Sequence, residues 1–267
     1  MKSVVITGST KGIGLGLARE FLKSDSSVFI SSRSKDKLEQ VVHDLKETYG
    51  NDRVMGQTCD VTDSNQVKAL WDAAKQKFGK VDIWINNAGM TNTTRPLLEL
   101  DISEINPIIN TNITGLIYGC MIPLKGMTEQ GFGQIYNMEG HGSDDRKLPG
   151  LTVYGTTKRA LRYFSEALID EAEDTPVQVG MLSPGIVLTD FLINDMKKMS
   201  PEQLETAKAV YNCLADKPET VTPFLVENIL KNDKNGTEIV WLTDEKANER
   251  FNSDKYNSRD LFTELGL

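Results

Sequence analysis

The sequence has few of the residues that bind transition metals or form disulfide frameworks. Its 267 residues include three cysteines, Cys59, Cys120 and Cys213, and two histidines, His43 and His141. The cysteines are too few and too scattered for a disulfide framework or a zinc site, and the histidines lie far apart in the chain. We therefore expect no metal centre, and a protein that keeps its thiols reduced in the cytoplasm.

The chain also lacks an excess of basic residues and any long hydrophobic run. Its 30 Lys and Arg residues against 38 Asp and Glu residues give a net charge of −8, which argues against a nucleic-acid or anionic-membrane surface. No apolar stretch approaches the roughly 18 residues of a membrane span, and the first residues resemble a strand rather than a signal peptide. The length suits one domain with a sizeable core.

Short apolar runs alternate with longer amphipathic stretches along most of the chain. The expected strands are Val4–Thr7, Ser27–Ser31, Arg53–Thr58, Val81–Asn86, Gln134–Asn137, Gln178–Ser183 and Glu238–Trp241, and the expected helices are Gly14–Leu22, Lys35–Thr48, Ser64–Phe78, Ile105–Thr128 and Thr152–Glu173. Continuously apolar strands indicate a parallel sheet that is buried on both faces. We predict a single α/β domain over residues 1–267, a Rossmann-type doubly wound parallel sheet with helices on both faces.

Two segments interrupt the alternation of strands and helices. Residues 190–223 carry helical patterning and lie between the sixth and seventh expected strands. In open parallel sheets the loops at the carboxyl ends of strands build the ligand site, so we interpret residues 190–223 as a substrate lid. Its apolar residues, such as Phe191 and Met196, would cover an apolar substrate or pack a core. The second segment is a charged C-terminal tail over residues 243–267.

A glycine-rich turn follows the first expected strand. Residues 7–14 read Thr-Gly-Ser-Thr-Lys-Gly-Ile-Gly and lead into an expected helix. Glycines let the backbone approach a pyrophosphate, and a helix N-terminus offers it unpaired N–H groups and a partial positive charge. An ordinary glycine-rich turn looks similar in isolation, but the parallel-sheet pattern favours a dinucleotide site. Its residues would be Gly8, Ser9, Lys11, Gly12, Ile13 and Gly14.

The second expected strand ends without the acidic residue that usually accepts hydrogen bonds from the ribose of NAD. The segment reads Ile30-Ser31-Ser32-Arg33, and Lys11 lies within the glycine turn. Two cations without a carboxylate suit the additional 2′-phosphate of NADP, which an arginine can bind through two hydrogen bonds. The alternative is that Arg33 is a solvated residue at a helix start. We predict NADP(H) as the cofactor.

Tyr154 and Lys158 lie four residues apart in an expected helix and therefore share one of its faces. Hydride transfer to a carbonyl builds negative charge on its oxygen, which then needs a proton from a positioned acid. The pKa of a free tyrosine is roughly 10, and a nearby ammonium lowers it. The pair predicts proton transfer by Tyr154 with the help of Lys158, although most such pairs are a surface aromatic beside a solvated lysine.

Six motifs in order resemble the short-chain dehydrogenase/reductase family over about residues 2–242. They are Thr7–Gly14, Cys59-Asp60-Val61, Asn86-Asn87-Ala88-Gly89, Asn110–Gly115, Tyr154-x-x-x-Lys158, and Ser183-Pro184-Gly185 leading to Thr189. The resemblance implies that Asp60 faces the adenine, that Lys158 also holds the nicotinamide ribose, and that Asn112 joins a proton relay. It implies further cofactor contacts from Val61, Asn86, Ala88, Gly89, Tyr154, Pro184, Gly185, Val187 and Thr189.

One residue of the family pattern is missing. Most members carry a serine about thirteen residues before the tyrosine, where its hydroxyl orients the substrate carbonyl. Here His141 stands at that distance from Tyr154, and the motifs align Gly140 or Glu139 with the serine. Ser143 is the nearest hydroxyl, and a loop flexed at glycines could bring it into place, with His141 as the other candidate. The predicted catalytic residues are Tyr154, Lys158, Asn112 and Ser143.

Three segments, 137–143, 153–162 and 239–247, resemble the chlorophyll b reductase branch of the family, which reduces the formyl group of a large flat chlorin with NADPH. This resemblance implies an NADPH-dependent reduction of a hydrophobic aldehyde or ketone to an alcohol. The resemblance to the family as a whole implies a homodimer or homotetramer formed by the helices over 105–128 and 152–173. The alternative is a sensor or scaffold that binds NADP(H) without turnover, which would account for the displaced serine.

Overall fold

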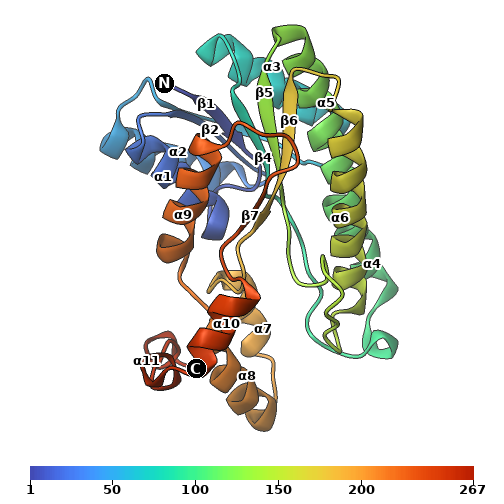
Figure 1. The fold of residues 1–267 in the computed structure, drawn as a ribbon, viewed down its shortest axis with the longest axis vertical. Helices are drawn as coiled ribbons and strands as arrows, with labels where there is room; N and C mark the ends of the chain where they lie inside the picture. Colours follow the sequence, from blue (N-terminus) through green and yellow to red (C-terminus); the bar gives the residue numbers. More distant parts are fainter.

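The computed structural model describes residues 1–267 and contains one seven-stranded sheet (Figure 1). The strands are β1 Ser3–Ile6, β2 Ser27–Ser32, β3 Val54–Thr58, β4 Ile83–Asn86, β5 Gly133–Met138, β6 Val177–Ser183 and β7 Glu238–Val240. Their order is β3-β2-β1-β4-β5-β6-β7, and every pairing is parallel. The chain thus winds outward from β1 in both directions, which confirms the predicted doubly wound Rossmann-type fold.

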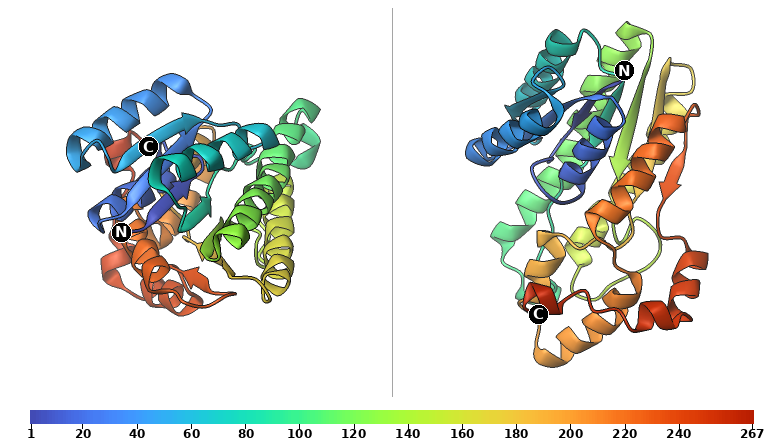
Figure 2. Two further views of the ribbon diagram at one scale, coloured as in Figure 1. Left: turned by 90° about the horizontal axis from the view of Figure 1, so that it is seen from above. Right: turned by 90° about the vertical axis from the view of Figure 1, so that its left-hand side faces the viewer.

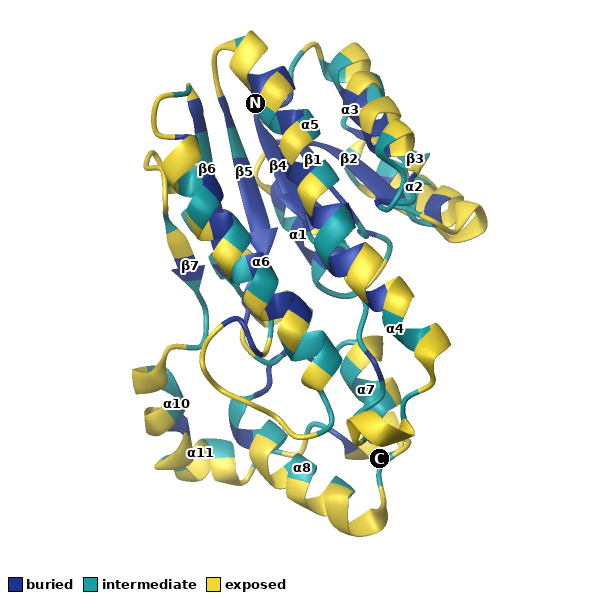
Figure 3. Cartoon of the chain, turned by 90° about the vertical axis from the view of Figure 1, so that its right-hand side faces the viewer, coloured by how far each residue is buried: buried dark blue, intermediate teal, exposed yellow.

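Helices cover both faces of the sheet (Figure 2). One face carries α1 Gly12–Lys23, α2 Lys35–Tyr49 and α9 Pro218–Lys231, and the other carries α3 Ser64–Phe78, α5 Gly115–Gln130 and α6 Thr152–Glu171. Within β1, Val4 and Ile6 belong to the core on the first face, and Val5 belongs to the core on the second. Both sides of each inner strand are therefore buried, which explains their continuous apolar sequence. Figure 3 shows the matching pattern on α6, whose buried positions turn toward the sheet.

The long helix that the sequence predicts over 105–128 is divided in the structure. Helix α4 spans Ile102–Ile109, a π-helical segment spans Asn110–Thr114, and α5 follows directly. Asp101 begins α4 with a capping box, because its side chain accepts from the N–H of Ser103 at 2.7 Å and Glu104 caps it in return. The π-helical turn carries Asn112, and such turns often occur at functional sites.

Residues 190–223 form two helices and the start of a third. Helices α7 Asp190–Met196 and α8 Pro201–Leu214 lie beyond the carboxyl ends of the strands, as Figure 1 shows. Helix α9 begins at Pro218 and packs on α1, where a Cβ on Gly16 would come within 2.8 Å of Thr222. Residues 218–223 thus belong to the helical layer on the sheet. None of the helices is both long enough and apolar enough to cross a membrane.

The C-terminal tail folds back onto the region around α8. Its elements are α10 Asp244–Phe251, α11 Asp254–Asn257 and a 3₁₀ turn at Thr263–Leu265; a further 3₁₀ turn at Leu97–Glu99 precedes α4. Asp216, which follows α8, accepts from Arg250 of α10 and from the indole of Trp241, each at 2.7 Å. Phe262 is 1% exposed and packs in a small core with Met196. The tail therefore packs against α7 and against the residue that follows α8.

Candidate active site

The glycine turn between β1 and α1 packs directly against two other loops at the carboxyl end of the sheet. Gly8 and Gly12 have positive φ angles of +62° and +54°. A Cβ on Gly8 would lie 2.9 Å from the Cα of Ala88, and a Cβ on Gly12 would lie 3.1 Å from the methyl group of Thr189. The absence of side chains at these positions therefore brings residues expected to bind the cofactor together from three segments.

The N-terminus of α1 is open to an anion. Lys11 is the N-cap residue, its side chain makes no capping hydrogen bond, and the first turn with Ile13 and Gly14 has no acidic residue. The unpaired N–H groups and the helix dipole there favour a phosphate. Ser9 faces inward instead, because its hydroxyl donates to the carbonyl of Ile6 at 2.7 Å and accepts from the N–H of Ser31 at 3.0 Å.

Thr7 and Asn87 fasten the glycine turn to the end of β4. The hydroxyl oxygen of Thr7 accepts from the N–H groups of Asn87 at 3.0 Å and Ala88 at 3.1 Å. The Asn87 amide donates to the carbonyls of Thr7 and Gly8, each at 2.9 Å. Sequence reasoning assigned neither residue to the site, although two adjacent asparagines after a buried strand were a signal of such cross-linking.

Asn86 turns its side chain into the core rather than toward the glycine turn. Its amide nitrogen donates to the carbonyl of Gly119 at 3.0 Å and to Asn137 at 2.9 Å, and its oxygen accepts from the Trp84 indole at 2.8 Å. The structure thus gives this side chain a bracing function between β4, β5 and α5. Ala88 and Gly89 follow β4, and Ala88 packs against the glycine turn at Gly8. Their contacts with a cofactor stay a prediction.

Arg33 and Asp60 lie after the carboxyl ends of the neighbouring strands β2 and β3. Arg33 is exposed, and one of its guanidinium nitrogens is 3.9 Å from the sulfur of Met90. One carboxylate oxygen of Asp60 accepts from the N–H and the hydroxyl of Thr62, at 3.0 and 2.8 Å. Val61 is buried beside Gly115, where a Cβ would come within 2.7 Å of it. Strand β2 ends at Ser32 and contains no acidic residue.

The segment after β6 carries the remaining residues of the expected cofactor site. Pro184 is followed by Gly185, whose φ of +70° and whose close approach to Leu242 both require glycine. Val187 is buried and pairs with Asp216 in an isolated β-bridge. Thr189 is the N-cap residue of α7 and contacts the glycine turn through its methyl group.

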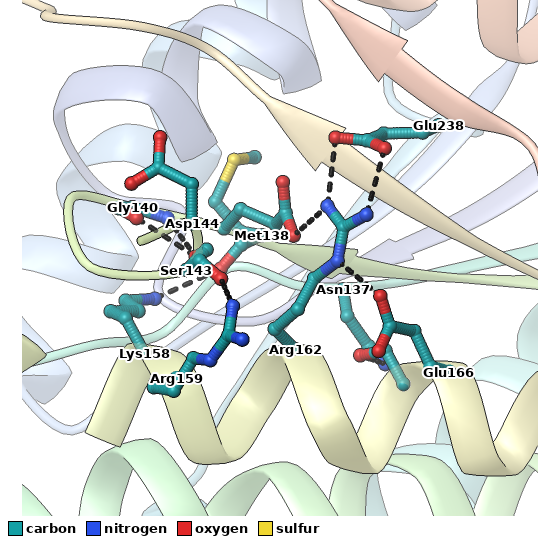
Figure 4. A network of polar contacts seen from close by, with 12 residues as sticks. Asn137, Met138, Gly140, Ser143, Asp144, Lys158, Arg159, Arg162, Glu166 and Glu238 are labelled. Atoms are coloured by element: carbon teal, nitrogen blue, oxygen red, sulfur yellow. Dashed lines mark hydrogen bonds and ion pairs between the residues drawn. The ribbon is translucent and has the colours of Figure 1, made fainter. Parts of the chain in front are cut away.

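Tyr154 and Lys158 lie on α6, with the Lys158 ammonium 5.8 Å from the centre of the tyrosine ring. The ammonium donates to the carbonyl of Met138 at the end of β5, at 2.9 Å (Figure 4). A narrow cavity beside it is lined by Thr7, Ala88, Asn112, Met138 and Lys158, among others. Lys158 therefore faces a cavity that also includes Thr7, at the start of the glycine turn, and Ala88, in the loop after β4.

Burial determines the protonation states of this pair. It raises the pKa of the Tyr154 hydroxyl, so the expected lowering by Lys158 is not found in the structure. Burial also lowers the pKa of Lys158 to about 8, although the negative charge of Glu139 raises it in part. Tyr154 is therefore protonated at neutral pH, which is the state that an acid needs before it donates a proton.

Asn112 braces the site through both ends of its amide. Its oxygen accepts from the N–H of Met90 at 2.8 Å, and its nitrogen donates to the carbonyl of Met90 at 2.8 Å and to the hydroxyl of Thr157 at 2.9 Å. The side chain is 2% exposed and links the loop after β4 to α6. Its function in a proton relay stays a prediction.

Gly140, rather than Ser143, lies against the Tyr154 hydroxyl, because a Cβ on Gly140 would overlap it. The hydroxyl of Ser143 donates to the carbonyl of Gly140 at 2.8 Å and accepts from its N–H at 3.1 Å. Ser143 thus closes a tight turn, with its proton bound to the backbone. His141 is exposed on the same turn, and partial burial lowers the pKa of its imidazole.

The fold and this site define a dinucleotide-binding oxidoreductase of the Rossmann type, and the comparisons with known proteins give its family. The family model for short chain dehydrogenases matches residues 2–200. The chain belongs to this family.

Named relatives include two plant proteins of rice (Oryza sativa subsp. japonica). Chlorophyll(ide) b reductase NOL is 42% identical over 232 residues, which cover 85% of this chain and 66% of the relative. Probable chlorophyll(ide) b reductase NYC1 is 36% identical over 258 residues, which cover 91% of this chain and 50% of the relative. The chain therefore spans just under two thirds of the first relative and half of the second.

A solved structure with the same fold is an alcohol dehydrogenase from the archaeon Thermococcus sibiricus, complexed with 5-hydroxy-NADP. It superposes with a TM-score of 0.75 at 27% sequence identity, covering 90% of this chain and 96% of the other.

Restoring the family serine with Gly140→Ser is expected to lower kcat by about 100-fold, since displacing a reacting group by about 1 Å has this effect. The new Cβ would overlap the Tyr154 hydroxyl and lie 3.1 Å from the Cε of Lys158. Steady-state kinetics would measure the loss. Gly155→Ala is the matched control, because its Cβ meets nothing closer than 4.0 Å. A gain in activity in Gly140→Ser would contradict the expectation.

Proposed function

We propose that the protein is an NADPH-dependent reductase that converts a hydrophobic aldehyde or ketone to an alcohol. The observation that carries this proposal is that Lys158, the neighbour of Tyr154 on α6, lines one cavity with Thr7 and Ala88. Thr7 begins the glycine turn that leads to the uncapped N-terminus of α1, and Ala88 packs against that turn at Gly8. The bound cofactor would supply the hydride. Gly12, Ile13 and Gly14 would hold its pyrophosphate, and Asp60 and Thr189 would contact its two ends.

The residues of the chain would handle the proton and the charge. Because burial raises the pKa of Tyr154, its hydroxyl is protonated at neutral pH, and it would donate that proton to the carbonyl oxygen as negative charge develops there. The positive charge of Lys158 would then stabilise the phenolate that remains. Because the Met138 carbonyl holds Lys158 at 2.9 Å, the charge is already in place before the reaction.

Two cations and a missing acid support the preference for NADPH. Arg33 and Lys11 are both exposed near the expected position of the adenosine ribose, and β2 ends without a carboxylate. The alcohol dehydrogenase of similar fold was solved with an NADP derivative. Lys11 is 3.4 Å from Asp190, with both side chains well exposed, so this weak ion pair can yield to a phosphate.

Arg33→Gln is expected to weaken NADPH binding by about 10- to 100-fold, because it removes charge-assisted hydrogen bonds worth about 1.5–3 kcal/mol. NADH binding should be unchanged, since NADH has no 2′-phosphate. Fluorescence titration of both cofactors measures the difference. Lys46→Gln, at the opposite end of α2, removes the same charge and serves as the control. Equal weakening of NADH and NADPH would refute the assignment of Arg33 to the phosphate.

An exposed aromatic residue beside the acid supports a hydrophobic substrate. Phe191 of α7 is 42% exposed, and its ring centre is 5.9 Å from that of Tyr154. Helix α7 is held closed by Asp195, which accepts from the N–H and hydroxyl of Thr94 at 2.8 and 2.6 Å. A substrate would enter under this lid and place its apolar body against Phe191. The plant relatives are named as chlorophyll(ide) b reductases, which supports a large flat carbonyl compound.

The test follows NADPH oxidation with a panel of ketones, aldehydes and a formyl chlorin. Turnover that prefers NADPH over NADH and requires Tyr154 would support the proposal. The second candidate, a sensor or scaffold that binds NADP(H) without turnover, is favoured by one observation: the Ser143 hydroxyl is bound to Gly140. Tight NADPH binding without turnover of any compound would support this candidate.

We also propose that the protein forms a homodimer or homotetramer in a reducing compartment such as the cytoplasm. Ile109, Ile117, Met121 and Tyr163 are apolar or aromatic residues exposed on α4, α5 and α6. All three cysteines are buried and free of disulfides. Light scattering after gel filtration would measure the mass in solution.

A further inference from the structure

Glu139 is a buried carboxylate next to the proton-transfer pair. It directly follows β5 and precedes Gly140, and its side chain is 3% exposed. Its N–H donates to the carbonyl of Leu182 at 2.8 Å, which fixes its position at the edge of the site. Burying a carboxylate is costly unless it is paired. Glu139 takes no part in the proton and hydride transfers proposed above.

The partner of Glu139 is Arg162 of α6, at 3.0 Å. The same guanidinium pairs with Glu238 of β7 at 2.9 Å and with Glu166 of α6 at 2.6 Å. Three carboxylates therefore surround one guanidinium, and negative charge is in excess. Burial raises the pKa of Glu139, and Arg162 opposes this rise by stabilising the carboxylate form.

This cluster is continuous with Tyr154 and Lys158. Positions 154, 158, 162 and 166 follow one another at four-residue steps on one face of α6. On the facing strand end, the Met138 carbonyl binds the Lys158 ammonium, and Gly140 lies against the Tyr154 hydroxyl. Glu139 lies between Met138 and Gly140 in the chain. The strand end that binds the Lys158 ammonium therefore also carries the Glu139 carboxylate.

Few charged groups face Lys158. Glu139 follows Met138, whose carbonyl binds the Lys158 ammonium, and its negative charge acts on Lys158; Tyr154 is the titratable neighbour on α6. The π-helical segment and the ends of β1 and β4 line the same cavity with Asn112, Thr7 and Asn86, which are all neutral. Burial lowers the pKa of Lys158 to about 8, and the charge of Glu139 opposes that change. Without this charge the pKa would fall further toward neutral pH, and the ammonium would lose its proton there.

We propose that Glu139 is a positioning residue whose carboxylate, held by Arg162, keeps Lys158 in its ammonium form at working pH. The role of that ammonium in catalysis rests on the proposed reductase function. The electrostatic coupling of the two side chains can be measured without turnover.

The first experiment follows the titration of Lys158 by NMR in protein labelled with ¹³C at the lysine Cε, with its signal assigned by its loss in Lys158→Met. In Glu139→Gln the titration midpoint of Lys158 should fall by roughly one pH unit. Glu166→Gln is the matched control, because it removes another carboxylate from Arg162 but is 54% exposed and is not among the charges that act on Lys158. An unchanged or raised midpoint in Glu139→Gln overturns the proposal.

A second variant, Lys158→Met, tests the same coupling through the pKa of Glu139. This test does not require Glu139→Gln to fold. Coupling between two sites is reciprocal, so Lys158→Met should raise the pKa of Glu139, measured with ¹³C-labelled glutamate. Methionine replaces a buried ammonium with an apolar side chain of similar length. A Glu139 titration that stays where it is in the unmodified protein overturns the proposal.

Turnover then tests the catalytic part. In Glu139→Gln the alkaline limb of the kcat/KM profile should move to lower pH by the same amount as the NMR midpoint, and Glu139→Asp should move it back. A shifted Lys158 titration beside an unchanged alkaline limb overturns the catalytic role. Absence of turnover in the unmodified protein would instead reject the proposed function, while the NMR titrations still decide the coupling.

Discussion

Tyr154→Phe is expected to lower kcat by about 10²- to 10⁴-fold, the usual contribution of a positioned general acid. The substitution removes the proton donor and keeps the ring, whose centre lies 5.9 Å from that of Phe191. NADPH affinity should therefore stay nearly unchanged. Single-turnover kinetics and fluorescence titration measure the two quantities separately.

A matched control is available on the same helix. Tyr163 is 75% exposed, so Tyr163→Phe removes a phenolic hydroxyl that faces solvent and should leave kcat unchanged. Full activity in Tyr154→Phe would show that Tyr154 is not the proton donor. Loss of NADPH binding in that variant would show that the hydroxyl contributes to cofactor binding rather than to proton transfer.

Asp216→Ala is expected to lower the free energy of unfolding by about 3–5 kcal/mol, the cost of leaving a buried charge without its partner. Arg250 is 3% exposed and pairs with Asp216 at 2.7 Å, and Arg259 lies 3.5 Å from the other carboxylate oxygen. Urea denaturation measures the loss, and limited proteolysis should show cleavage within residues 243–267. The tail would detach because its ion pair and the indole hydrogen bond are lost together.

Asp244→Ala is the control for this prediction, because Asp244 belongs to the same tail but its side chain is 92% exposed. Its effect should be within about 0.5 kcal/mol, as for most surface substitutions. A loss of similar size in both variants would contradict a specific effect of the buried ion pair.

The sheet and the glycine turn could be predicted from the sequence because their physical requirements are local. Strands that are buried on both faces need continuous apolar residues, and Gly8 and Gly12 adopt backbone angles that favour glycine. The spacing of Tyr154 and Lys158 likewise depends only on the helix repeat. Each of these features is encoded within a few neighbouring residues.

Other features depend on contacts between distant segments and were not predictable in this way. The direction of Ser143 is decided by hydrogen bonds within its loop, and the pKa of Tyr154 by burial that the whole fold creates. The packing of α9 on α1 joins two segments that lie far apart in the sequence. The link between Asp216 and Arg250 joins two segments that no short motif connects.

The four-residue steps along α6 have a consequence for how this protein can change. The hydroxyl of Tyr154, the ammonium of Lys158 and the guanidinium of Arg162 keep their alignment only while the helix repeat between them is intact. Inserting or deleting one residue between 154 and 162 would rotate the later groups by about 100° around the helix axis. Natural or designed variation in this stretch is therefore limited to substitutions. A change in length would separate the Tyr154 hydroxyl from the Lys158 ammonium and the Arg162 guanidinium.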